Sequence, residues 1–185
     1  HDVRLALFDT LAISGSFSLW NLVFNSNSTS GKTITLGAGS NLNVLGTLTF
    51  DNSLAGAMAP NGGTLSARGD VVVDNQNYSG TTVLSLCGSG NQTLSCAGSL
   101  LAGGLPPISV NKPGGTLLLS GMLRTGKGLT LVAGSVDPGT STVVLSDTLP
   151  ITGSFPFNNL VANSNSTVAK TITLGAATNL DVRGT

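Results

Sequence analysis

The sequence predicts an all-β chain that folds as a parallel β-solenoid, in which the backbone winds in irregular coils. Residues 13–47 return as residues 151–185, and 24 of the 35 aligned positions are identical without any insertion or deletion. Short runs of alternating apolar and polar side chains occur along the whole length, whereas helix signals are almost absent. A stack of similar layers explains such a repeat, because every layer packs on a copy of the one before it.

The alternating runs are the expected strands. They are rich in Thr, Val, Leu and Ile, and clusters of Gly, Pro, Asn and Asp at 61–63, 112–115 and 137–139 separate them as turns. The expected strands cover residues 33–36, 48–50, 71–73, 82–86, 116–119, 129–132 and 142–145.

The repeat divides the chain into one full unit, residues 1–138, and the start of the next unit, residues 139–185, which is equivalent to residues 1–47. Coils of about 28 residues are expected, so that about five coils make up one period. With stacked parallel strands about 4.8 Å apart, one period would advance the solenoid axis by about 24 Å. The proposed coil starts lie near Thr33, Thr64, Thr82, Thr116, Thr142 and Thr171.

Glycine is expected at the corners of the coils. A pattern of two apolar positions on either side of a glycine spans residues 42–50, recurs in weaker form at 65–73 and begins again at 180–185. Glycine within an alternating run lets the backbone bend without a Cβ clash. A β-sandwich is the competing architecture, but its antiparallel strands would give no reason for the two stretches of the chain to match.

Composition excludes some classes of partner. Only 9% of the residues are charged and the formal net charge is zero, so the basic field that nucleic acid or an anionic membrane needs is missing. No apolar run approaches the roughly 18 to 20 residues of a membrane helix. We therefore expect no nucleic-acid partner and no membrane insertion. Residues 1–13 also lack the basic and apolar regions of a signal peptide.

Candidates for catalysis and metal binding are weak, and we expect no enzyme, no cofactor and no metal site. His1 is the only histidine. Asp70 and Asp74 share one face of an extended run about 13 Å apart, which is more than either glycosidase mechanism uses. The residues 68–70 spell Arg-Gly-Asp, but the corner pattern already explains that glycine. The Gly-Gly pairs lack the aspartate of calcium-binding β-rolls.

Asparagine and threonine have structural explanations as well. Asn-x-Ser/Thr sequons begin at Asn27, Asn77, Asn91 and Asn165, in a chain whose Asn, Ser and Thr content generates them by chance. Stacked amides in the coil turns are the preferred interpretation, because they can satisfy one another between layers. Thr-x-Thr pairs are not carried through every coil, as an ice-binding ladder would require.

Two interpretations stay open for the cysteines. Cys87 and Cys96 flank a Gly-Ser-Gly-Asn turn. They could face each other and form a disulfide, which would imply an oxidising compartment. They could equally be two buried thiols. The spacing does not suit zinc.

The stretches KTITLGAGSNLNVLGTLTF (32–50) and KPGGTLLLSGMLRTGKGLTLVAGSVDPGTSTVVL (112–145) resemble the β-helical repeat regions of bacterial surface and secreted proteins, such as filamentous haemagglutinins, autotransporter passengers and large extracellular repeat fibres. The resemblance covers the whole chain and is one of composition. It implies a location outside the cell or on its surface, and a role as an adhesin, stalk or filament.

The expected function is structural: a building block of an extracellular fibre that stacks head to tail on copies of itself, either as a covalent tandem array or as separate subunits. Each buried aliphatic side chain would contribute about 1.5 to 3 kcal/mol to the stack. An adhesin or glycan-binding module is the alternative, with Trp20 as the anchor of the binding site. In the second copy of the repeat the position of Trp20 is occupied by Asn158, so such a site would not recur there. The residues expected to form the stacking layers are Phe17, Leu36, Leu42, Val44, Leu48, Phe155, Leu174, Leu180 and Val182.

Overall fold

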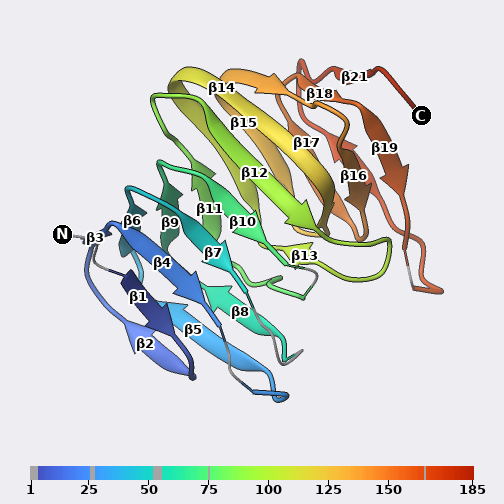
Figure 1. The fold of residues 1–185 in the computed structure, drawn as a ribbon. Coiled ribbons are helices and arrows are strands. Elements are labelled where there is room, and N and C mark those ends of the chain that lie inside the picture. Colours follow the sequence, from blue (N-terminus) through green and yellow to red (C-terminus); the bar gives the residue numbers. More distant parts are fainter. Residues whose placement is uncertain (1–3, 26–27, 52–55, 75, 165) are drawn as a thin grey trace.

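A computed structural model describes residues 4–25, 28–51, 56–74, 76–164 and 166–185. Within these ranges the chain forms 21 β-strands and no helix. The strand pairs in these ranges are all parallel, and the chain winds around one axis as a stack of coils, with the N-terminal coils at one end and the C-terminal coils at the other (Figure 1). The fold is therefore the predicted β-solenoid.

Each coil has three faces, and strands on the same face of successive coils pair as a ladder. Ladder 1 contains β1 (Arg4–Leu7), β4 (Asn21–Phe24), β7 (Leu48–Phe50), β10 (Val71–Val73), β12 (Gln92–Ala97) and the middle of β14 (Ile108–Thr125). It continues into the end of β15 (Leu129–Asp137), against which β18 (Phe155–Phe157) packs, and β18 pairs with β21 (Leu180–Val182).

Ladder 2 begins with β2 (Leu11–Ile13), β5 (Lys32–Leu36) and β8 (Met58–Asn61). Backbone hydrogen bonds from Met58 to Asn77 and from Tyr78 to Gly104 carry it across a coil without a regular strand. It then includes β13 (Gly104–Leu105), the end of β14, β16 (Thr142–Leu145) and β19 (Asn159–Ala162).

Ladder 3 is the longest unbroken series. It contains β3 (Phe17–Leu19), β6 (Asn41–Val44), β9 (Thr64–Ala67), β11 (Val83–Leu86), the start of β14, the start of β15, β17 (Leu149–Thr152) and β20 (Ile172–Leu174). Seven turns of the solenoid are counted along it. Its paired residues are Phe17, Leu42, Leu65, Leu84, Ile108, Leu129, Ile151 and Leu174.

The coils are shorter than the sequence suggested, so one period contains more of them than expected. Along ladder 3 the shortest coil runs from Leu65 to Leu84 and the longest from Phe17 to Leu42. The proposed coil starts fall on different faces: Thr33 lies in ladder 2 and Thr64 in ladder 3. The number of residues between two positions on different faces is not one whole coil. Counting between such positions therefore overestimated the number of residues in a coil.

The predicted turn at 112–115 lies within β14, which bends from ladder 3 through ladder 1 to ladder 2. Gly115 and Gly121 adopt positive φ angles of 66° and 76° there, so the strand changes direction without leaving the sheet. Glycine therefore acts as a corner residue, as expected, but inside a continuous strand rather than between two strands.

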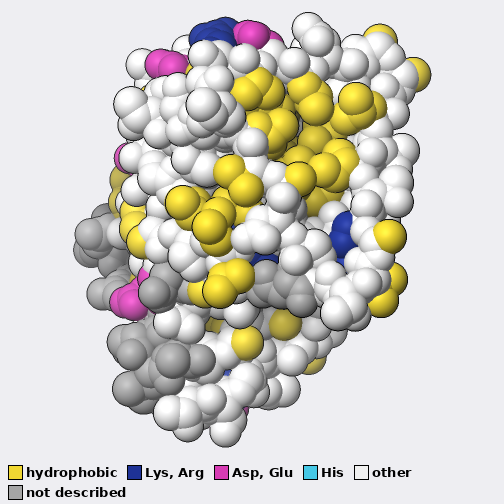
Figure 2. Space-filling model, turned by 90° about the vertical axis from the view of Figure 1, so that its right-hand side faces the viewer, with side chains coloured by type: hydrophobic (Ala, Val, Ile, Leu, Met, Phe, Trp, Pro, Cys, Tyr) yellow, Lys and Arg dark blue, Asp and Glu magenta, His cyan; other side chains and the backbone are white. Residues whose placement is uncertain are grey.

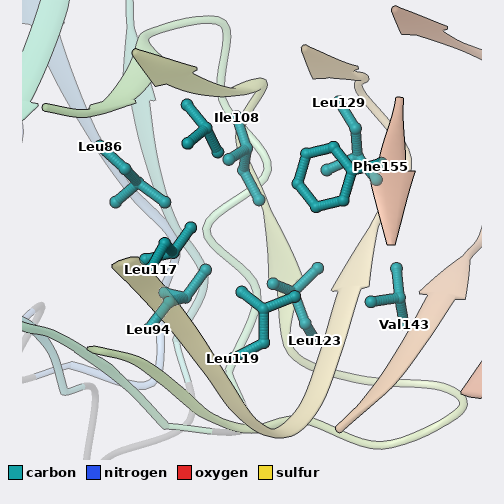
Figure 3. A pocket seen from close by; sticks show the side chains of 10 residues that line it. Leu86, Leu94, Ile108, Leu117, Leu119, Leu123, Leu129, Val143 and Phe155 are labelled. Atoms are coloured by element: carbon teal, nitrogen blue, oxygen red, sulfur yellow. The ribbon is translucent and has the colours of Figure 1, made fainter. Parts of the chain in front are cut away.

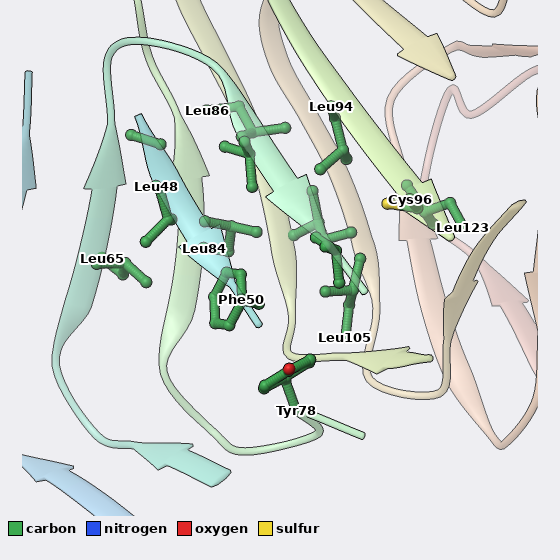
Figure 4. Packing of buried hydrophobic residues seen from close by; sticks show 14 of the residues in the cluster. Leu48, Phe50, Leu65, Tyr78, Leu84, Leu86, Leu94, Cys96, Leu105 and Leu123 are labelled. Atoms are coloured by element: carbon green, nitrogen blue, oxygen red, sulfur yellow. The ribbon is translucent and has the colours of Figure 1, made fainter. Parts of the chain in front are cut away.

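Inward side chains from the three ladders fill the centre of the coils. Leu48, Leu65 and Leu84 come from three different strands and point toward a common interior, as Figure 4 shows. Phe24 stacks on Phe50 of the next coil, with ring centroids 5.0 Å apart, and Phe50 contacts Tyr78 at 4.9 Å. The core is thus a continuous column that runs along the axis.

Close stacking of the corners makes Gly69 a sensitive position. A Cβ atom at Gly69 would stand very close to the carbonyl oxygen of Gly46 in the neighbouring coil. Backbone cannot yield as a flexible side chain can, so we expect Gly69→Ala to lower the free energy of unfolding by about 2 kcal/mol. Urea denaturation followed by circular dichroism measures this change.

Gly90→Ala is the matched control. A Cβ atom there would meet nothing within 4 Å, so its effect should stay within about 0.5 kcal/mol. Equal effects of the two substitutions would contradict the close approach of the coils at Gly69.

Candidate functional site: the repeated stacking layers

The repeated sequences form the same layer twice. In the first copy β2 pairs with β5 so that Ile13 lies opposite Leu36, and in the second copy β17 pairs with β20 so that Ile151 lies opposite Leu174. Two further strand pairs have the same register in both copies. The pair β3–β6 corresponds to β18–β21, and the pair β1–β4 corresponds to β16–β19. Every one of these registers is therefore preserved between the two copies.

The corners of the two layers also carry the same hydrogen bonds. The side-chain oxygen of Asn21 accepts a hydrogen bond from the backbone N–H of Thr47 at 2.7 Å. Asn159 accepts the equivalent bond from Thr185 at 3.0 Å. These amides satisfy a backbone donor of the next coil where the chain turns, which differs from the expected amide-to-amide stacking.

An ion pair extends the repeat beyond the stretch of high identity. Lys32 and Asp9 lie 2.8 Å apart, and so do Lys170 and Asp147. In each pair the hydrogen bond from the lysine ammonium holds the pKa of the aspartate carboxyl below its usual range. Sequence reasoning missed both pairs, although the tripeptide Asp-Thr-Leu at 9–11 and 147–149 would have revealed them.

The outer surface of the layer is covered in the first copy and uncovered in the second. Strands β7, β8 and β9 cover the coil that contains β4, β5 and β6, so Leu36 is 2% exposed and Val44 is fully buried. Their equivalents Leu174 and Val182 are 48% and 41% exposed. Figure 2 shows hydrophobic side chains gathered in a recessed area on the side of the molecule that faces right in Figure 1.

The opposite surface of the layer shows the reverse difference. Phe17 in the first copy is 49% exposed, whereas its equivalent Phe155 is 3% exposed. Phe155 lies in strand β18, which packs against β15. The ring of Phe155 stacks on the ring of Phe157, with centroids 5.4 Å apart. Apolar side chains line a hollow on the uncovered surface of the first coil: Leu5, Leu7, Leu11, Ile13, Phe17, Leu19 and Leu42.

The nine predicted stacking residues thus fall into two groups. One group is buried between coils: Leu36, Leu42, Val44, Leu48 and Phe155. The other group lies on the uncovered surfaces of the first and last coils and is exposed or half-buried: Phe17, Leu174, Leu180 and Val182.

The described core offers no ligand cavity of useful size. An enclosed space lies among the core leucines near Ile108 and Phe155 (Figure 3), and its volume is about 10 Å³. A water molecule needs about that much space together with polar partners, and every residue that lines this void is apolar. It is a packing void of the core.

The cysteines do not form the disulfide that was one of the two open interpretations, because both are free. Cys96 lies inside ladder 1, opposite Val73, and is buried. Cys87 follows β11 of ladder 3, and its thiol donates to the carbonyl of Ala67 at 3.6 Å. The Gly-Ser-Gly-Asn segment is a corner between two faces and not a hairpin, so the two thiols lie on different faces.

Polar side chains considered for chemistry serve the scaffold. Asp70 accepts a hydrogen bond from the backbone of Thr93, and Arg68 donates to Asn43. Asp74 accepts the hydroxyl proton of Tyr78 at 2.8 Å. Each of these bonds joins neighbouring coils or braces one coil.

Two of the sequons can be placed in the same way. Asn77 and Asn91 accept backbone hydrogen bonds from the next coil, from Gly104 and Thr116 respectively. His1, Asn27 and Asn165 lie outside the described residues.

Lys112 is a structural residue that the sequence did not reveal. It is 2% exposed, and its ammonium donates to the carbonyls of Gly88 and Gly90 and to the side chain of Gln92. Gln92 in turn donates to the carbonyl of Ala67 at 3.0 Å. The lysine therefore closes a buried corner by satisfying carbonyl groups that the strand ladders leave without a partner.

Comparisons with known proteins identify no relative: no family model, no curated protein and no solved structure matches the chain. Among the described residues, no group of three or more His, Cys, Asp or Glu side chains could hold a metal ion. The same part of the chain contains no helix long and apolar enough to cross a membrane.

Thiol labelling tests the placement of the cysteines. Burial raises the pKa of Cys96 to about 12, so almost no thiolate forms there at pH 8. We expect Cys87 to react with a maleimide in the native protein at least about 100-fold faster than Cys96, and both to react in urea.

Mass spectrometry of the labelled protein gives the stoichiometry, and Cys87→Ser should abolish native labelling. A native mass that is two hydrogens lighter, with no labelling before reduction, would show a disulfide and contradict the structure.

Proposed function

We propose that this chain is a structural β-solenoid segment of an extracellular fibre or surface appendage, and that the fibre lengthens by stacking further copies of the same layers. One observation carries this proposal: the layer formed by residues 4–47 recurs at 142–185 on the same axis with its strand registers preserved. A solenoid that repeats its own layer can repeat it again.

The covering of the first copy indicates what would cover the second. Strands β7, β8 and β9, within residues 48–67, lie on the first layer, and this pairing buries Leu36, Leu42 and Val44. The last coil presents the equivalent leucine and valine side chains. A segment with the sequence of residues 48–67 is therefore the partner that fits this surface.

A covalent tandem array agrees better with these contacts than the abutment of separate subunits. In the second copy, β14 and β15 cover the inner surface of the layer. Direct abutment of two chains would instead place β1–β3 on β19–β21, a contact between layers that the described strand pairs do not include. Tandem continuation uses only contacts that the structure already contains.

The extracellular setting and the bacterial class rest on the resemblance to β-helical repeat regions. The structural role is supported by the interior, since the described core is filled with aliphatic side chains and the void among them measures only about 10 Å³. A fibre needs repetition and stability, and both are properties of the coil stack.

A glycan-binding adhesin is the second candidate, because Trp20 is 51% exposed. Exposed indole rings provide flat apolar surfaces to which ligands bind. Its equivalent is Asn158, so a binding site built on Trp20 would occur once in each period.

Glycan binding provides a test of this second candidate. A panel of glycans should alter the tryptophan fluorescence if the chain is an adhesin, and Trp20→Ala should reduce binding at least about tenfold. A structural segment should show no such response. Phe8→Ala is a matched control, because Phe8 is an equally exposed aromatic residue at 52%.

Extension of the chain tests the stacking surface. We expect a chain in which residues 48–67 are added after Thr185 to gain on the order of 2 kcal/mol in free energy of unfolding, because the added coil buries apolar surface. Hydrogen exchange of the β20 and β21 amides should slow at the same time.

The matched control is the same extension with Leu48→Asp and Leu65→Asp in the added segment, which keeps its length and loses its inward leucines. If both extensions leave stability and exchange unchanged, the last coil is not a stacking surface and the proposed function fails.

A further inference from the structure

The two copies of the repeated layer do not occupy the same faces of the solenoid. Ile13 lies in β2, on ladder 2. Its equivalent Ile151 lies in β17 and pairs with Leu129, on ladder 3. The second copy is therefore displaced by one face.

The other strands of the layer show the same displacement. Strand β1 belongs to ladder 1, whereas its equivalent β16 pairs with the end of β14 on ladder 2. Strand β3 begins ladder 3. Its equivalent β18 continues ladder 1, because it packs against β15 and pairs with β21. All three faces have moved on by one position in the same direction.

Counting along ladder 3 gives the number of coils in one period. Phe17 and Ile151 are six turns apart on this ladder. Ile13 lies one face before Phe17 in the same coil. The period that carries Ile13 onto Ile151 therefore equals six coils plus one face of a three-faced coil.

We infer that each period is turned by about one third of a turn relative to the one before it, so that a fibre of such periods presents the same surface feature on three sides in succession. This inference rests on the proposed function, because it concerns how successive periods continue. The same face returns after three periods, which corresponds to about 90 Å along the axis at about 4.8 Å per coil.

The corners explain why the displacement is tolerated. The corner that joins Asn21 to Thr47 lies between ladders 3 and 1, whereas the equivalent corner that joins Asn159 to Thr185 lies between ladders 1 and 2. Both make the same hydrogen bond. A strand register depends on the adjacent coil and on the nearest corner, so each face can accept the same strands.

The rotation between successive periods changes which side chains the fibre presents on each of its sides. Trp20 is exposed once in each period, at a corner, and in a straight array with whole coils per period it would line one edge. With one face of rotation per period, successive copies lie about 30 Å apart along the axis on successive corners. A partner could then engage the fibre from any side.

A marker on a concatenated chain tests the inference. The chain contains residues 1–138 four times, followed by residues 139–185, and carries Cys87→Ser and Ser89→Cys so that each full period has one exposed thiol. Ser89 lies in an exposed corner. After labelling with maleimide-gold, electron microscopy should show rods that lengthen by about 30 Å per period, with successive markers rotated by about one third of a turn.

The outcomes separate the inference from the proposed function. Rods with all markers on one side would overturn the rotation and leave the structural role intact. Compact particles that do not lengthen with added periods would overturn the proposed function, and the inference with it.

Spin-label distances in the single chain provide a matched control in the Cys87→Ser background. Ser18 and Thr152 lie on ladder 3 six turns apart, so the pair Ser18→Cys and Thr152→Cys should give about 29 Å. The equivalent of Ser18 is Pro156, on another face, so the pair Ser18→Cys and Pro156→Cys should give a longer distance. Equal distances for the two pairs would place the equivalents on one face and overturn the rotation.

Discussion

Hydrogen bonding between coils is the constraint on which this structure depends. Strands of the inner coils find their backbone partners on the coils before and after them, as Leu42 does between Phe17 and Leu65. Apolar contacts follow the same direction, since Phe24 stacks on Phe50 of the next coil. A single coil can neither pair its backbone nor bury its side chains, so the core of the protein and the interface between its repeating parts are the same set of contacts.

Polar side chains at the corners complete this arrangement. Where the chain leaves one face, its N–H and C=O groups lose their ladder partners and must be satisfied by other means. Asn21 and Asn159 supply acceptors for the next coil, and buried Lys112 supplies donors to three oxygen atoms. These contacts reach across coils, so they fix how one coil sits on the next as well as where it turns.

The fold class could be predicted because alternating strands and a long internal repeat are properties of local sequence. The burial of Leu36 and Val44 was predictable for the same reason, since both stand in alternating runs. Coil length was not, because Thr33 and Thr64 look alike in sequence and lie on different faces. The placement of Cys87 and Cys96 also depended on whether their shared turn reverses the chain or moves it to another face, and short turn motifs do not distinguish these outcomes.

The equivalence of the three faces has a consequence for how such a gene can grow. A duplicated block would ordinarily have to contain whole structural units, or the second copy would meet the wrong neighbours. Here a block that ends at a corner adds a whole number of faces and meets neighbours of the same kind, as the second layer of this chain does where β16 pairs with β14 and β17 pairs with β15. Unequal recombination can therefore add a segment of coding sequence that encodes a fractional number of coils, and the longer chain still folds.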